Sequence, residues 1–316
     1  MAEAAALRWR LVGGAVPVTA ALAVVPLFVS DYVVSLLLII FANIAMATAW
    51  SFFSGTTRYI SLATAAFVGV GSYAMAVLIS VVPMPVALAA AALAGFLLAL
   101  LVGLSTLRLR GVYFVIFTFG LAELIKQLMI WYEINENKTM MRMIFADVSS
   151  LTLYEILLGL AALVVVGTWI ASHTRLGFAL RAIGEDETVA RHTGVNTTRV
   201  KVLVFAGSAA VIALTGAVLA MRYTYIDPNV GFNSVWSFNI LIMALLGGPG
   251  RAWGPMLGVV PLVLLSEVLA GSFPHHFGIA LGLCFVVIVY FLPGGIARLI
   301  ERLAERAAGA RERRAS

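Results

Sequence analysis

Residues 175–194 read RLGFALRAIGEDETVARHTG and form the longest polar interruption in an otherwise apolar sequence. The stretch lies between two hydrophobic runs, 151–171 and 200–221, and each run is long enough to cross a bilayer. Its mixture of small, apolar and charged residues is typical of a short helical element on a membrane surface. A membrane protein with one shaped polar element of this kind typically uses it to contact a soluble partner. The stretch therefore predicts a membrane-embedded pore that works with a separate motor.

Composition extends the membrane prediction to the whole chain. Of its 316 residues, 62% are hydrophobic and 11% are charged, whereas soluble domains carry about 25% charged residues. Nearly all of the chain is needed for spans, which predicts a single transmembrane domain over residues 1–316. One cysteine, Cys284, allows no internal disulfide framework. The net charge of +6 indicates basic cytosolic loops rather than nucleic-acid binding.

Apolar windows of about 20 residues predict an all-α bundle of about ten spans. The first window is not followed by a cleavage site typical of a signal peptide, so we expect it to be retained. The window at 237–248 is short, which predicts a tilted, broken or re-entrant helix. The windows are 11–29, 33–52, 60–80, 86–107, 112–132, 151–171, 200–221, 237–248, 255–272 and 277–292.

Basic residues predict the orientation of these spans. With the N-terminus in the cytosol, 17 of the 21 Lys and Arg residues fall on cytosolic segments. Cytoplasmic loops are enriched in Lys and Arg, so the split places both termini in the cytosol. Residues 296–308 carry apolar side chains on one helical face, which predicts an amphipathic C-terminal helix on the inner leaflet. The four outer basic residues are Lys126, Lys138, Arg142 and Arg222.

The polar stretch itself predicts two short helices. The first has Thr174 as its candidate N-cap, and Gly184 is expected to end it. Acidic residues at 185–187 then favour the first turn of a second helix, because they suit the positive end of the helix dipole. Gly194 fits the C′ position of that helix, and residues 196–197 can cap the next span. From these residues alone, a docking element and an ordinary basic loop both remain open.

Four stretches of the chain carry a resemblance to a known family. They are SLATAAFVGVGSY at 61–73, RLRGVYFVIFT at 108–118 with Glu123 following, GFALRAIGEDE at 177–187 with Ala190 and Gly194, and LGGPGRAWGP at 246–255 with Gly258. In this order they resemble the motifs of the integral membrane permeases of branched-chain amino-acid type ABC importers. The resemblance covers most of the chain. It implies an ATPase-coupling role for Arg181, Glu185, Asp186, Glu187, Ala190 and Gly194.

The same resemblance implies partners, a location and a solute class. Expected partners are a second permease subunit, two cytosolic ABC ATPase subunits that bind the ATP, and a periplasmic or lipid-anchored solute-binding protein. The expected location is the bacterial cytoplasmic (inner) membrane. The implied solute is a branched-chain or related amino acid. Ala63 and Thr64 stand where the family usually has Gly and His or Gln, and the loop 133–150 lacks the usual Thr-Gly-Gly element. Urea, short amides and aromatic acids therefore remain alternatives.

Polar residues inside the predicted spans are candidates for the translocation path. Glu123 lies near the middle of its window, where a carboxylate is costly and rarely faces lipid. Lys126 shares its helical face, so an internal ion pair is the alternative to a role in the path. The path candidates are Asn43, Ser61, Thr64, Glu123 and Asn239, and the two Asn residues are also candidates for helix–helix hydrogen bonds. Close helix packing is predicted at Gly69, Gly71, Gly95 and Gly103.

Two other functional classes compete with this interpretation. An ion-coupled secondary transporter would use Glu123 as its proton carrier. An intramembrane enzyme would need a nucleophile–base spacing that the sequence does not contain. The Gly-rich run at 247–250 lacks the Gly-Lys-Ser/Thr ending of a phosphate loop. We therefore expect no catalytic residue, no metal site and no cofactor in this chain, and no nucleic-acid partner.

Overall fold

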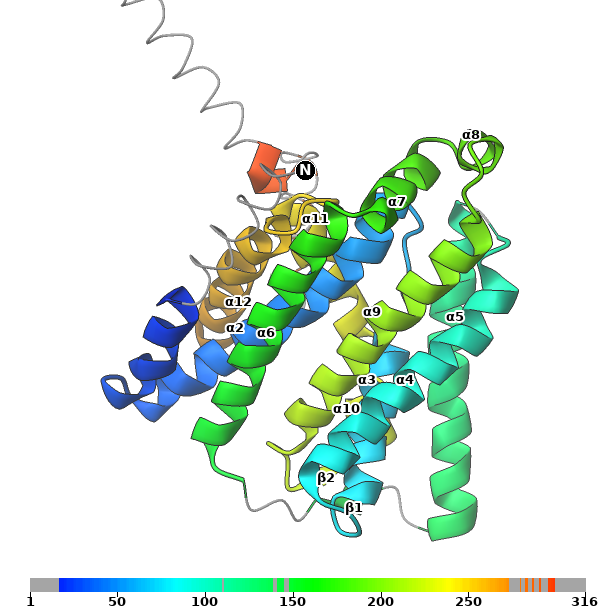
Figure 1. The fold of residues 1–316 in the computed structure, drawn as a ribbon. Coiled ribbons are helices and arrows are strands. Elements are labelled where there is room, and N and C mark those ends of the chain that lie inside the picture. The colour runs from blue at the N-terminus through cyan, green and yellow to red at the C-terminus, as the bar shows by residue number, and fades with distance from the viewer. Residues whose placement is uncertain are drawn as a thin grey trace, which may run out of the picture.

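Helices dominate the computed structural model (Figure 1). It describes residues 17–109, 111–138, 141–144, 148–272, 279, 282–283, 286, 290 and 295–298. Within this part, seven helical segments are long and apolar enough to cross a membrane. The chain is therefore a polytopic helical membrane protein, as its composition predicts. The predicted span 277–292 and the amphipathic helix 296–308 lie largely outside the described residues, and the count of ten spans is not confirmed.

Shorter elements connect some of the seven long segments. The long segments are α2 (Asp31–Trp50) with the π-helix η2 (Ser51–Gly55), α4 (Met84–Thr106), α5 (Val112–Tyr132) with the π-helix η3 (Glu133–Asn137), α6 (Ser150–Ser172), α9 (Thr197–Ala220), α10 (Pro228–Gly231) with α11 (Val235–Gly247), and α12 (Gly254–Ser272). Shorter apolar helices are Pro17–Leu27, which includes η1 (Val25–Leu27), and α3 (Thr64–Leu78). Of the alternatives for the short window 237–248, the structure shows a helical segment that begins further upstream, at Pro228, where Asp227 caps α10, and that is interrupted at residues 232–234, before α11 runs unbroken to Gly247.

Helix α9 lies at the centre of the bundle and packs against α3, α4, α2 and α6. Small residues bring its backbone close to its neighbours. A Cβ on Gly71 of α3 would lie 1.9 Å from the Ala213 carbonyl oxygen, and one on Gly216 would lie 2.5 Å from the Val68 carbonyl oxygen. A Cβ on Gly95 of α4 would lie 2.4 Å from the Ala213 side chain. The packing role predicted for Gly71 and Gly95 is confirmed, since only glycine fits these contacts.

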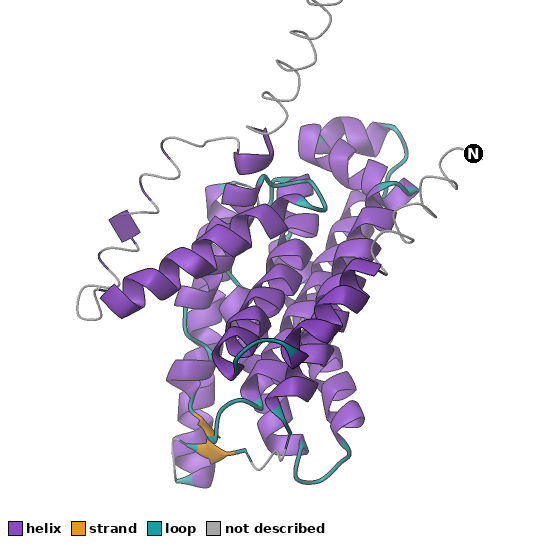
Figure 2. Ribbon diagram, turned by 90° about the vertical axis from the view of Figure 1, so that its left-hand side faces the viewer, coloured by secondary structure: helices purple, strands orange, loops and turns teal. Residues whose placement is uncertain are grey.

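One short sheet departs from the all-α prediction. Strands β1 (Arg142–Met143) and β2 (Tyr225–Ile226) pair in antiparallel register, with Arg142 opposite Ile226. They join the α5–α6 and α9–α10 connections at the end of the bundle opposite α7 and α8 (Figures 1 and 2). Arg142 Nε also donates to Glu133 Oε1 at 2.5 Å, and the Glu133 side chain is fully buried. The Arg142–Glu133 ion pair thus holds the α5–α6 connection against the end of the α5–η3 segment.

Candidate functional site

The polar stretch folds as α7 (Arg175–Glu185) and α8 (Glu187–His192), which cross one end of the bundle between α6 and α9 (Figure 1). The prediction that Gly184 ends the first helix is wrong. Helix α7 continues to Glu185, and the break falls at Asp186, whose backbone is extended. Gly184 serves a close approach instead, because a Cβ there would lie 2.1 Å from the Thr56 carbonyl oxygen. The glycine thus lets α7 rest directly on the end of the α2–η2 segment.

Both ends of α8 are closed by local hydrogen bonds. The Asp186 carboxylate accepts from the backbone N–H groups of Thr188 at 2.7 Å and Val189 at 3.2 Å, as an N-cap does. At the other end, the N–H of Val195 donates to the Ala190 carbonyl and that of Gly194 donates to the Arg191 carbonyl. Gly194 has φ +85°, so it occupies the predicted C′ position of a Schellman motif.

A polar cluster around a buried Glu–Lys pair fastens α8 to the membrane-spanning helices. We call Glu187, Lys201, Tyr59 and Arg191 the Glu187 cluster. Lys201, near the start of α9, donates to Glu187 Oε1 at 2.9 Å and to the Leu107 carbonyl at 3.0 Å. The Tyr59 hydroxyl donates to Glu187 Oε2 at 2.6 Å and accepts from Lys201 at 3.0 Å. Arg191 adds a third contact to the carboxylate at 2.8 Å. The Glu187 carboxylate therefore joins α8 to α9 and to the segment before α3, and Lys201 extends the cluster to the end of α4.

The surroundings of Glu187 favour its charged form. Burial alone would raise the pKa of this carboxyl, but hydrogen bonds from Tyr59, Lys201 and Arg191 outweigh burial and lower the pKa to about 2. Lys201 is also almost fully buried, with 3% of its side chain exposed. Two opposite charges held this way stabilise each other, whereas either one alone would be stranded in the protein interior.

The outward face of α7 and α8 is partly apolar. Phe178 is 62% exposed and Val189 is 59% exposed. The Arg181 guanidinium lies over the Phe178 ring, with its carbon 4.7 Å from the ring centroid. Apolar side chains that rise from a charged surface are typical of a protein interaction site.

The six residues with an implied coupling role divide between the two faces of this element. Arg181, Glu185, Asp186 and Gly194 are exposed, whereas Glu187 and Ala190 are buried. Glu187 therefore holds α8 in place from the inner side, and a soluble partner would meet the exposed group.

The path candidates Ser61 and Thr64 lie at a break in the helical structure. Helix α3 has 15 residues and rises only about 22 Å, whereas the bilayer core is about 30 Å thick. The non-helical residues 58–63 precede it and are mostly buried. The predicted span 60–80 is therefore part helix and part irregular chain.

Hydroxyl groups from other helices satisfy the backbone of this break. Thr118 of α5 accepts from the Leu62 N–H at 3.1 Å. Ser237 of α11 accepts from the Ala65 N–H at 2.9 Å and donates to the Leu62 carbonyl at 2.7 Å. The Trp50 indole donates to the Ser61 carbonyl at 2.8 Å. Irregular backbone at membrane depth requires this kind of internal partner. The neighbouring helices therefore stabilise the non-helical conformation of this break.

Glu123 lies midway along α5 among polar neighbours. Its Oε1 is 3.6 Å from Lys126 Nζ and accepts from Gln127 Nε2 at 3.1 Å. Its Oε2 accepts from the Ser234 hydroxyl, just before α11, at 3.5 Å. The Glu123 side chain is nevertheless 41% exposed, and α5 is the least buried of the seven long segments. The ion pair and an open polar face therefore occur together at this position.

A double-mutant cycle measures how much the ion pair contributes. Glu123→Gln and Lys126→Met should each destabilise the chain, and the two changes should couple by about 1 kcal/mol, because the pair is only partly buried. The readout is thermal unfolding of the purified chain. The same cycle between Lys126 and Glu136, at the end of the same segment, serves as the control and should show no coupling. A coupling near zero for Glu123 would exclude the pair.

The two amide candidates for the translocation path, Asn43 and Asn239, have fewer polar contacts than Glu123. Asn43 is buried, and its Nδ2 donates to the Ile39 carbonyl of its own helix at 2.8 Å. A hydrogen bond between two helices was predicted for Asn43, but this bond lies within α2. Asn239 of α11 is partly exposed. Neither amide lies in the Glu187 cluster or contacts Glu123.

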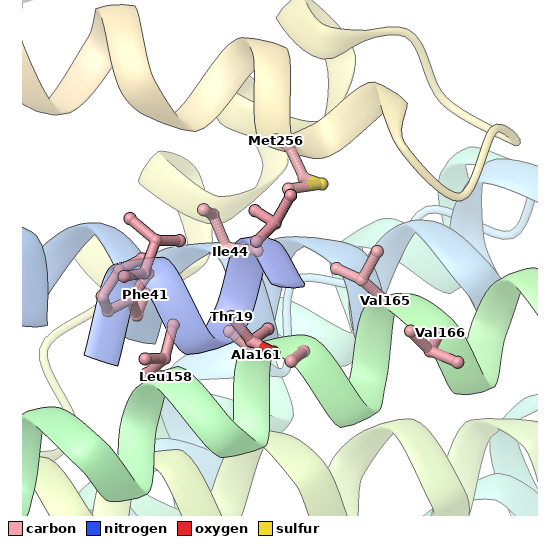
Figure 3. A pocket seen from close by; sticks show the side chains of 11 residues that line it. Thr19, Phe41, Ile44, Leu158, Ala161, Val165, Val166 and Met256 are labelled. Atoms are coloured by element: carbon pink, nitrogen blue, oxygen red, sulfur yellow. The ribbon is translucent and has the colours of Figure 1, made fainter. Parts of the chain in front are cut away.

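A pocket of about 290 Å³ lies between the Pro17–Leu27 helix, α2, α6 and α12. Figure 3 shows its lining, where Met256 of α12 and Leu158 of α6 lie on opposite sides. The lining side chains are almost all aliphatic or aromatic, and Thr19 carries the polar group that Figure 3 shows there. Such a surface suits lipid or another apolar group and offers little to a polar solute.

Sequence reasoning missed three residues of the Glu187 cluster, namely Tyr59, Arg191 and Lys201. Lys201 counts in the sequence only as one more cytosolic basic residue. Its place inside the first turns of an apolar span is the signal that could have marked it as buried and paired. Tyr59 carries no such signal, because it lies 128 positions from the carboxylate that it contacts.

Comparison with known proteins supplies an independent view of the chain. Residues 11–292 match the family model described as "Branched-chain amino acid transport system / permease component". No solved structure gives a significant match.

Three curated relatives represent the similar sequences. The high-affinity branched-chain amino acid transport system permease protein BraD of Pseudomonas aeruginosa is 34% identical over 131 residues, which is 41% of this chain and 42% of that protein. LivM of Salmonella typhimurium, named likewise, is 28% identical over 245 residues, or 67% of this chain and 56% of that protein. LivH of Escherichia coli is 33% identical over 128 residues, or 39% and 40%. The chain thus spans about half the length of these relatives or less.

Proposed function

This chain belongs to the family of permease components of branched-chain amino acid transport systems, and on that premise we propose that it is the transmembrane permease subunit of an ATP-driven importer. It would form the translocation path for a small polar solute, a branched-chain or related amino acid, and it would not itself act as an enzyme. The observation that carries the proposal is the α7–α8 element, whose outer face is open to a soluble partner while the Glu187 cluster fastens its inner face to three parts of the bundle.

The energy source is assigned to separate subunits. Residues 1–316 contain no Gly-Lys-Ser/Thr phosphate loop. We propose that two cytosolic ABC ATPases bind ATP and contact the outer face of α7 and α8. Phe178, Arg181 and Val189 would lie at this contact. Matches to both LivM and LivH support a second permease subunit. A periplasmic or lipid-anchored solute-binding protein would deliver the solute from outside.

The translocation path is assigned to the open face of α5. Glu123 lies midway along this segment and is partly exposed in the isolated chain. Lipid is an unfavourable neighbour for a carboxylate at that depth, so the face needs a protein or aqueous neighbour. The second permease subunit would be the protein neighbour, and a polar channel between the two subunits would supply the water. Ser61 and Thr64 lie at the break that packs against the same helix through Thr118.

The orientation follows from charge. The end of the bundle with α7 and α8 carries Arg58, Arg108, Arg175, Arg181, Arg191 and Arg199, whereas the opposite end near the β1–β2 pair carries Lys138, Arg142 and Arg222. The positive-inside rule supports a cytosolic location for α7 and α8. We propose that both termini are cytosolic and that the membrane is the bacterial inner membrane.

Transport by the reconstituted complex tests this function. Radiolabelled leucine uptake into proteoliposomes should require ATP and the ATPase subunits, and it should persist when the proton gradient is collapsed, because hydrolysis supplies the energy. The same assay with urea, a short amide and an aromatic acid in place of leucine assigns the solute. Uptake by this chain alone under a pH gradient would overturn the proposal and favour a secondary transporter with Glu123 as proton carrier.

Coupling through α8 should depend on the turn at Gly194. Gly194→Val places a β-branched residue at φ +85°, which should cost about 1–2 kcal/mol and loosen the end of α8. In nanodiscs, the complex should then lose most solute-stimulated ATP hydrolysis while nucleotide binding persists. Gly194→Asn is the matched control, since Asn tolerates this conformation, and it should retain stimulation. Normal stimulation in the Val variant would rule out a coupling role for this turn.

A further inference from the structure

A cationic pocket lies beside the Glu187 cluster where α4 ends. Its volume is about 130 Å³, and its charged lining consists of Arg108, Arg191, Lys201 and Glu187. Three cations against one carboxylate leave the lining with two net positive charges. Thr198, in the first turn of α9, adds a hydroxyl group and the positive end of a helix dipole. The chemistry of the pocket therefore matches an anion.

Arg108 is the side chain that this pocket leaves free for a ligand. Arg191 and Lys201 already contact Glu187 at 2.8 and 2.9 Å. Among the described residues, Arg108 has no ion-pair or hydrogen-bond partner, and it is exposed beside Leu107. A guanidinium of this kind binds phosphate oxygens readily, because it presents several N–H donors in one plane.

An apolar stripe on α4 leads directly into the pocket. Leu104 lines the pocket, and Leu101, Leu97 and Leu93 continue along the same helical face toward the middle of α4. All four side chains are more than half exposed. The stripe has the length and character to follow a hydrocarbon chain, whereas a soluble partner would have no access to leucines at that depth.

We propose that this pocket and stripe together form a binding site for an anionic phospholipid of the inner leaflet. The phosphate group would lie between Arg108, Arg191 and Thr198, and one acyl chain would run along the α4 leucines. Basic pockets between helices on the cytoplasmic side of a membrane hold lipid headgroups in this manner. The site lies against the Glu187 cluster, so an occupied pocket would stabilise the attachment of α8. A lipid site of the inner leaflet rests on the proposed cytosolic location of α7 and α8, and it is independent of the proposed solute and energy source.

Native mass spectrometry of the full chain in detergent tests the site. The probes are phosphatidylglycerol and phosphatidylcholine with identical acyl chains at equal concentration. The unmodified chain should retain phosphatidylglycerol about fivefold more than phosphatidylcholine, which is the effect of about one basic residue near a membrane surface. Arg108→Gln should remove most of this preference. Arg108→Lys should keep it, because the charge remains.

Controls separate the possible occupants of the pocket. Arg199→Gln changes the same charge at an exposed position on α9 outside the pocket lining, and it should leave the preference unchanged. Inorganic phosphate at matched concentration should not displace the lipid, because it lacks the chain that follows α4. Equal retention of the two lipids by the unmodified chain would overturn the proposal, and so would displacement by free phosphate. A photocrosslinker at position 108 that captured an ATPase subunit instead of lipid would also overturn it. The lipid comparison on the unmodified chain holds even if Arg108→Gln fails to fold.

Discussion

Glu187→Gln should destabilise the chain by about 3–5 kcal/mol, because it leaves a buried ammonium group without its counter-charge. Lys201 is 3% exposed, and Glu187 is the carboxylate that it contacts. The Tyr59 hydroxyl and the Leu107 carbonyl remain as hydrogen-bond partners, but neither carries a charge. Thermal unfolding of the purified chain, followed by intrinsic fluorescence, measures the loss.

Glu185→Gln is the matched control for this substitution. Glu185 precedes Glu187 by two positions and pairs with Arg58 at 3.1 Å, but both side chains are largely exposed. Its loss should cost less than about 1 kcal/mol. The double change of Glu187→Gln with Lys201→Met should recover part of the stability, because no charge is then stranded. Equal effects of the changes at 185 and 187 would show that the Glu187 cluster does not hold α8.

The same cluster predicts a defined response to acid. The folded-state pKa of Glu187 is lowered from its ordinary 4.5 to about 2. Its stabilisation is therefore complete above about pH 4.5 and is lost as the pH falls toward about 2. The difference in stability between the unmodified chain and Glu187→Gln should shrink over this interval. A difference that stayed constant from pH 5 to pH 2 would contradict the lowered pKa.

Gly216→Ala should destabilise the contact of α9 with α3 by about 1–3 kcal/mol, because the added methyl group overpacks the interface. A Cβ at this position would lie 2.5 Å from the Val68 carbonyl oxygen. Backbone atoms cannot rotate away as a side chain can, so the two helices would have to separate. Thermal unfolding of the purified chain again measures the effect, and expression in the membrane gives a second readout.

Gly207 offers a control on the same helix. A Cβ at Gly207 would meet no atom within 4 Å. Gly207→Ala should therefore be neutral or stabilising by up to about 1 kcal/mol, because alanine is the better helix former. Both substitutions make the same chemical change in the interior of α9, so any difference between them reports packing. Equal stability of the two variants would argue against a close α3–α9 contact.

The sequence alone was sufficient for features that depend on neighbouring residues. Long apolar runs predict spans because the bilayer core requires about 20 apolar residues, and most of the predicted windows coincide with helices. The Gly194 turn after α8 and the Asn196 cap of α9 were predicted in the same way, since each acts on backbone groups within a few positions. Asp186 was predicted inside the first turn of α8 but caps it, and the predicted cap Thr174 makes no side-chain bond to the backbone of α7. The predicted helix end at Gly184 and the predicted span start at 237 were less accurate, because packing at Gly184 and the Asp227 cap before Pro228 set the observed boundaries.

Only the tertiary structure decided which polar residues work together. Glu187 meets Tyr59 across 128 positions and Lys201 across 14, and no local pattern encodes that meeting. The break before α3 exists because Thr118 and Ser237, on two other helices, satisfy its backbone. The physical reason is the same in both cases. A buried charge or a bare backbone is unfavourable until a partner lies within hydrogen-bond distance, and only the packing of the whole bundle brings these partners together.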